Sequence, residues 1–114
     1  STAEIYRGCA VSFAKSYDDI GIVAPQAADE LLAIKGVASS VVMYKTPVGV
    51  SFSARSLGGM NVQVIMEALG GGGHQTMAGA QIPDITPGEA KEKLLAAIDD
   101  YYEKAAGHAD EQIN

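Results

Sequence analysis

The feature that most constrains this chain is a run of four glycines followed by a histidine, Gly70-Gly71-Gly72-Gly73-His74. Four consecutive glycines lose much conformational entropy on folding, and no packing requirement visible in the sequence explains them. Side-chain-free backbone can approach a ligand closely and turn N–H groups toward an anion, and a histidine can donate to a phosphate oxygen. We therefore predict a phosphate-binding loop. The alternative is a flexible loop whose histidine bonds only to its neighbours.

The segments on both sides of this run have ordered strand and helix patterns. Val48 to Arg55 alternates most clearly, and Asn61 is a suitable N-cap for a helix whose apolar residues recur at spacings of three and four. Thr86 and Glu89 have the spacing of a capping box. The predicted elements are a strand over 5–13, a helix from Pro25 to Gly36, strands over 37–44 and 48–55, a helix over 62–69, a strand over 77–82 and a helix that ends at Gly107.

Interleaved strands and helices predict a single small α/β domain with a mixed sheet of about four or five strands packed by helices. We expect residues 1–4 to be a linker or the edge of a fragment, 5–107 to form the domain, and 108–114 to be a polar tail. No apolar run approaches the roughly 20 residues that a membrane span needs. The single cysteine, Cys9, excludes an internal disulfide and fits a cytoplasmic protein with a buried, inert thiol.

Arg55 is the second candidate for phosphate binding. The alternation of its strand places Arg55, Ser53 and Ser51 on one polar face, which is either exposed to solvent or part of a site. A guanidinium can hold a phosphate at two points, and one helix joins this strand to the glycine run, so Arg55 and His74 could converge. The alternative is a solvated arginine at the end of a strand. We expect Asn61 to cap the helix that follows it, and it could contact a ligand as well.

Several kinds of chemistry are missing from the sequence. Two histidines and no ligand-type carboxylate cluster predict no metal site, and no spacing supports a nucleophilic triad. The net charge is −6, from 8 basic and 14 acidic residues, which argues against a long nucleic acid as partner. Eight of the 14 acids lie from Asp84 onward, so the nearly neutral glycine region still suits a small anion. These residues should bind a phosphate and not cleave it.

The motifs together resemble a known family. Ser53-Ala54-Arg55-Ser56, the Asn-Val-Gln-Val-Ile-Met-Glu segment over 61–67, the Leu-Gly-Gly-Gly-Gly-His segment over 69–74 and Ala78-Gly79-Ala80-Gln81 resemble the DHHA1 domain of DHH-family phosphoesterases. Within the family, the sequence of these motifs is most similar to that of bacterial cyclic-di-AMP phosphodiesterases. The resemblance is specific from Ser51 to Ile82 and weaker before Val37.

The resemblance implies a division of labour between two domains. In this family the DHH domain holds manganese ions through aspartates and histidines and activates water, while the DHHA1 domain closes over that site and binds the substrate. Matched residue by residue, the substrate-binding roles fall on Gly71, Gly72, Gly73, His74 and Arg55, with Ser53 and Asn61 as weaker candidates. The Asp-His-His motif is absent from these residues. The resemblance therefore implies Mn²⁺ in a separate catalytic domain, and no catalytic residue or cofactor here.

The implied function is substrate binding for a metal-dependent phosphodiesterase that acts on cyclic dinucleotides. The implied partners are a cyclic or short linear dinucleotide and the DHH domain of the same chain, in a parent protein that could carry membrane segments elsewhere. Two alternatives stay open. One is an accessory domain of an exonuclease that acts on single strands or nano-RNA, and the other is a non-enzymatic interaction module, for example one that forms a homodimer.

Overall fold

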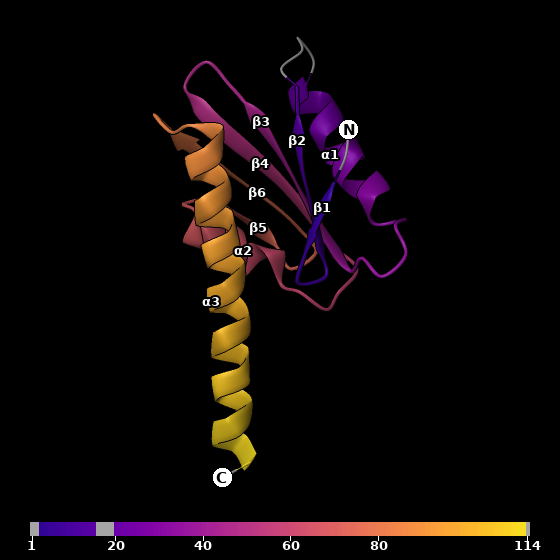
Figure 1. Cartoon of the computed structure of the whole chain (residues 1–114), viewed down its shortest axis with the longest axis vertical. Coiled ribbons are helices and arrows are strands. Elements are labelled where there is room, and N and C mark those ends of the chain that lie inside the picture. Colours follow the sequence, from indigo (N-terminus) through magenta and orange to yellow (C-terminus); the bar gives the residue numbers. More distant parts are fainter. Residues whose placement is uncertain (1–2, 16–19, 114) are drawn as a thin grey trace.

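The computed structural model describes residues 3–15 and 20–113, which form a sheet with helices on both faces (Figure 1). The described part contains a six-stranded sheet in the order β1-β2-β3-β4-β6-β5, in which β2 and β3 are parallel and all other neighbours are antiparallel. The elements are β1 (Glu4–Tyr6), β2 (Cys9–Ala14), α1 (Ile20–Leu31), β3 (Ser39–Lys45), β4 (Gly49–Ser56), α2 (Val62–Ala68), β5 (Gly72–His74), β6 (Met77–Pro83) and α3 (Pro87–Ile113). The predicted α/β class and mixed sheet are confirmed.

The sheet has more strands than the four or five that the sequence predicted. The segment over 5–13 is two strands, because Arg7 and Gly8 turn the chain with φ angles of 49° and 82°. β1 begins at Glu4, which we had expected to belong to a linker. The second additional strand is β5, which is formed by the end of the glycine run itself.

Each face of the sheet packs against its own helices. Figure 1 shows α1 on one side and α2 and α3 on the other. The main core lies between the sheet and α2 and α3, where Phe52, Ile65, Leu94 and Ile98 are buried. The smaller core lies under α1, where the Ser40 hydroxyl donates to the Ala28 carbonyl at 2.6 Å. The strands β3 and β4 are therefore covered on both faces.

The ends of two helices differ from the prediction. α1 begins at Ile20, so Pro25 lies inside it and leaves the Gly21 carbonyl without a helical N–H partner. α3 passes through Gly107 and continues to Ile113, so much of what was expected to be a polar tail is helical. A glycine inside a helix costs only about 1 kcal/mol relative to alanine, and Ala105 and Ala106 before it are strong helix formers.

The predicted caps of α2 and α3 are confirmed. The Asn61 side chain accepts a hydrogen bond from the Gln63 N–H at 3.1 Å. At α3 the Glu89 N–H donates to the Thr86 hydroxyl, and the Thr86 N–H donates to the Glu89 carboxylate, both at 3.1 Å. Across residues 3–15 and 20–113, no helix has the length and apolar character that crossing a bilayer requires.

Candidate phosphate-binding site

Three neighbouring strands place the two predicted phosphate-binding side chains in one row. Arg55 in β4 is directly opposite Met77 in β6, and Met77 is directly opposite His74 in β5. Directly paired residues point to the same face of a sheet, and neighbouring strands are about 4.8 Å apart. The Cα atoms of Arg55 and His74 are therefore roughly 10 Å apart. The register brings Arg55 and His74 to the same face, as a shared ligand would require.

The next row on the same face has very little side chain. Ser53 is opposite Gly79, and Gly79 is opposite Gly72. α1 packs on β3 and β4, so Ser53 is only 8% exposed, whereas the β6 and β5 part of this face is accessible. We call this accessible part, formed by Met77, Gly79, Gly72 and His74, the shelf. It lies beside α1, which forms a wall over β4.

Two of the four glycines serve the end of α2. Gly70 has a φ of +88°, and its N–H donates to the Glu67 carbonyl at 3.0 Å. The Gly71 N–H donates to the Met66 carbonyl at 2.8 Å, which completes a Schellman motif. These two N–H groups are occupied and cannot bind an anion. The expected loop of converging N–H groups is therefore a helix cap followed by the edge strand β5.

Close packing against β6 explains two of the glycines, and no local pattern indicates these contacts. A Cβ on Gly71 would lie 2.0 Å from the Gly79 carbonyl oxygen, and one on Gly73 would lie 2.5 Å from the Ala78 Cα. Gly73 also has a φ of +145°. Gly72 differs from both, because a Cβ there would meet no atom within 4 Å and its φ lies outside the left-handed region. Gly72 is thus the glycine of the shelf that the fold does not require.

Arg55 is held under α1 and is not free in solvent. Its Nε lies 3.2 Å from Oδ1 of Asp29 in α1, and its Nη1 donates to the Ala54 carbonyl at 2.9 Å. The Arg55 side chain is 11% exposed, against 63% for Asp29. The Nε–Asp29 contact has the distance of an ion pair but not the alignment of a hydrogen bond, so Nε has no hydrogen-bond partner within the described residues. The polar face of β4 is thus neither open nor a complete site, because α1 covers it.

The other predicted residues occupy different positions. His74 is exposed on the edge strand, and its side chain has no hydrogen bond or ion pair within the described part of the chain. The Asn61 side chain caps α2, and the Asn61 N–H donates to the hydroxyl of Tyr101 in α3 at 3.1 Å. Both contacts are with the helices on the face of the sheet opposite to the shelf. The structure therefore brings Arg55, His74 and Gly72 to one face, with Ser53 buried beside them, and does not bring Asn61 there.

Sequence reasoning missed two residues of this face. Met77 was recognised only as the start of a strand, and its place between Arg55 and His74 depends on the strand register. Asp29 was not singled out at all, because nothing in the spacing of a helix predicts which strand residue its outer turn will contact. Their place at the site could be found only from the fold.

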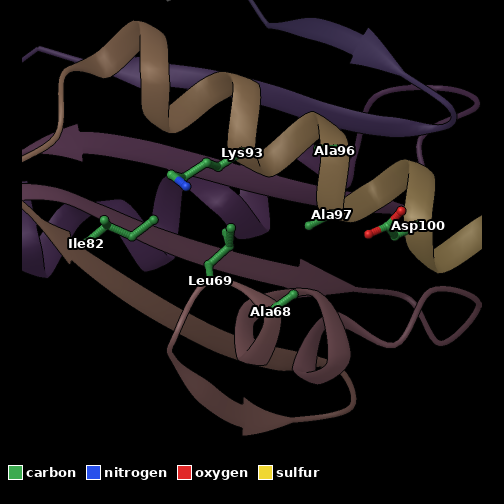
Figure 2. A pocket seen from close by; sticks show the side chains of 7 residues that line it. All are labelled: Ala68, Leu69, Ile82, Lys93, Ala96, Ala97 and Asp100. Atoms are coloured by element: carbon green, nitrogen blue, oxygen red, sulfur yellow. The ribbon is translucent and has the colours of Figure 1, made fainter.

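A pocket of about 340 Å³ lies on the opposite layer, between α2, β6 and α3. Figure 2 shows Leu69, Ile82 and Ala97 along it, with Lys93 and Asp100 at its two ends. It contains none of the predicted site residues, and its two charged groups have opposite signs and do not converge. The row of Arg55, Met77 and His74 is a better candidate for an anion site, because its two nitrogen-bearing side chains lie on one face of the sheet.

The described residues do not offer a metal centre. They contain no group of three or more His, Cys, Asp or Glu side chains placed to hold an ion. Cys9 is completely buried, and burial raises the pKa of its thiol, which disfavours the reactive thiolate.

Comparison with known proteins gives the family. The model of the DHHA1 domain matches residues 8–104. The chain is 55% identical over 83 residues to the cyclic-di-AMP phosphodiesterase GdpP of Geobacillus thermodenitrificans, and the aligned segment covers 72% of this chain and 13% of that protein. It is 46% identical over 102 residues to the cyclic-di-AMP phosphodiesterase PdeA of Listeria monocytogenes, and this aligned segment covers 87% of this chain and 16% of that protein.

More distant similarities agree with this result. The chain is 40% identical over 65 residues to the bifunctional oligoribonuclease and PAP phosphatase NrnA of Thermus thermophilus, covering 57% of this chain and 20% of that protein. The fold matches an exopolyphosphatase-related protein of Bacteroides fragilis with a TM-score of 0.73 at 20% identity, covering 87% of this chain and 31% of the other. The chain thus spans about 13% to 20% of the length of these curated relatives. It belongs to the DHHA1 domain family of DHH phosphoesterases.

Proposed function

We propose that this chain is the substrate-binding domain of a phosphodiesterase that acts on cyclic dinucleotides, with cyclic di-AMP as the first candidate. Arg55 and His74 hold phosphoryl oxygens, and the backbone of Gly72 lets the ligand approach the sheet. The metal ions, expected to be Mn²⁺, and the water that they activate belong to a DHH domain elsewhere in a longer chain. The similarity to two cyclic-di-AMP phosphodiesterases supports this choice of ligand.

The single observation that carries the proposal is the row formed by Arg55, Met77 and His74, in which Met77 and His74 are exposed and Arg55 lies at the edge of α1. With Nε at Asp29 and one Nη1 hydrogen at the Ala54 carbonyl, the remaining Nη hydrogens of Arg55 are available to an anion. The absence of a side chain at Gly72 is explained by close approach of a ligand, since no neighbouring atom requires it.

A second candidate is an accessory domain of an enzyme that degrades short RNA. The identity to the oligoribonuclease NrnA favours it, although over a smaller part of the chain. Both functions would use the same phosphate contacts, so they differ in whether the preferred ligand is cyclic or linear.

The test has two parts. In a longer protein that includes the DHH domain, Arg55→Ala and His74→Ala should each lower the turnover of cyclic di-AMP by at least tenfold, because a charge-assisted hydrogen bond contributes about 1.5–3 kcal/mol. Lys45→Ala is the matched control, since Lys45 is an exposed cation at the other end of β3. Unchanged turnover in both site variants would refute the proposal.

The second part uses the 114-residue chain and NMR titration with cyclic di-AMP and with linear di-AMP. Shifts should concentrate at Gly72, His74 and Arg55. Tighter binding of the linear ligand would favour the RNA-degrading alternative. No binding of either ligand, together with shifts that depend only on protein concentration, would support an interaction module instead.

A further inference from the structure

Met77 is an apolar side chain in the middle of the candidate phosphate site. It is 51% exposed, and it is directly paired with Arg55 on one side and with His74 on the other. Single exposed apolar residues are normal on protein surfaces, and Val48, 52% exposed, is one of them here. Met77 differs from Val48 because both of its cross-strand neighbours can bind an anion.

The side chain of Arg55 stays on its own side of Met77. Its Nε is at Asp29 in α1 and its Nη1 is at the carbonyl of Ala54, so the guanidinium is held close to β4. His74 is on the far side of Met77, on β5. A ligand whose phosphate contacts one of these residues and that extends toward the other therefore passes beside the Met77 side chain.

The surface next to Met77 has little side chain. Gly79 follows it by two residues on the same face of β6, and Gly72 is opposite Gly79. Neither has a side chain, so Met77 stands at the edge of bare backbone. A methionine thioether is flexible and makes favourable contacts with aromatic rings. A nucleobase or ribose can rest there while its phosphate is bound at the cationic side chain.

We infer that Met77 is a specificity-determining residue that contacts the nucleoside part of the bound ligand. The inference rests on the proposed function, because it takes Arg55 and His74 as the phosphate contacts. It adds that the site distinguishes a nucleotide from a bare phosphate through an apolar contact. The charged groups supply attraction to any phosphate, and Met77 supplies the preference for one that carries a base.

The test compares two ligands and two variants of the 114-residue chain. Met77→Ala should bind cyclic di-AMP about two- to tenfold more weakly, the loss expected for one sulfur–aromatic contact. Its affinity for inorganic phosphate should stay unchanged. Val48→Ala is the matched control, because it removes an equally exposed apolar side chain at the far end of β4's hairpin, and it should bind both ligands as the unaltered chain does. Met77→Leu keeps an apolar side chain without the sulfur, so it should restore only the part of the affinity that comes from apolar contact.

The outcomes separate the two proposals. If the unaltered chain binds cyclic di-AMP at the shelf and Met77→Ala binds it equally well, the inference about Met77 is wrong and the proposed function stands. If Met77→Ala weakens phosphate binding as much as nucleotide binding, Met77 supports the shape of the site and the inference is also wrong. If the unaltered chain binds neither ligand, both are wrong.

Discussion

Replacing Gly71, Gly72 and Gly73 one at a time distinguishes the glycines that the fold requires from the one that a ligand would require. Gly72→Ala adds one methyl group that meets no protein atom within 4 Å, at a φ that alanine can adopt. Because the substitution also reduces the freedom of the unfolded chain, we expect the free energy of unfolding to stay constant or rise by about 0.4–1 kcal/mol. Ligand binding should nevertheless be lost or strongly weakened, because the methyl group projects from the shelf.

The neighbouring positions are the matched controls, and they should respond in the opposite way. In Gly71→Ala the new Cβ would lie 2.0 Å from a backbone oxygen, and backbone cannot move aside as a flexible side chain does. We expect a loss of about 3 kcal/mol or more, at the upper end of overpacking costs. Gly73→Ala combines a contact of 2.5 Å with a φ of +145°, which adds roughly 1–3 kcal/mol of strain.

Thermal unfolding followed by circular dichroism measures the change in stability, and NMR titration with cyclic di-AMP measures the change in ligand affinity. For a domain of this size, 1 kcal/mol changes Tm by about 4 °C, so the stability differences are readily resolved. Gly72→Ala should unfold at or above the Tm of the unaltered chain and bind poorly. Wild-type affinity in this variant would refute close approach of a ligand at Gly72. A stable Gly71→Ala would refute the packing argument.

Two further predictions concern groups outside the site. Cys9 is buried and its thiol pKa is raised by burial, so DTNB should label it only after the chain unfolds; fast labelling of the native chain would contradict its position. Hydrogen bonds from the Thr86 N–H and hydroxyl lower the pKa of Glu89, so its stabilising effect is present at neutral pH and is lost as pH falls through that lowered pKa. The Tm difference between Glu89→Gln and the unaltered chain should therefore shrink from pH 7 to pH 3, and a constant difference would show that Glu89 does not stabilise the helix through its charge.

Local patterns were enough to predict the elements whose ends are determined by short-range chemistry. The Asn61 cap, the Thr86–Glu89 capping box and the strand from Met77 were all found from spacing, because each depends on residues a few positions apart. The helix ends at Pro25 and Gly107 were wrong. One glycine costs little in a helix, and the two alanines before Gly107 favour its continuation, whereas most residues before Pro25 are weak helix formers, so local propensity does not explain why α1 begins at Ile20.

The site was only partly predictable, because its geometry depends on pairing between distant segments. Arg55 and His74 could be named from their residue types, yet their alignment follows from Met77, which pairs with both. The close contacts that require Gly71 and Gly73 are with β6, so the sequence could not distinguish these two from Gly72. The burial of Arg55 under α1 could not be predicted from the sequence either, because it depends on how that helix crosses β4.

The fold also explains how an acidic chain can offer a site for an anion. From Asp84 onward, eight acids and three lysines contribute −5 to the net charge of −6, and seven of these acids belong to α3. α3 packs on the face of the sheet opposite to the shelf (Figure 1). The sheet lies between these acids and the shelf, so they are farther from a ligand there than Asp29 at the edge of α1 is. The charge that a ligand meets at the shelf is therefore that of its nearest groups, Arg55 with its partner Asp29, and the net charge of the chain says little about the ligand.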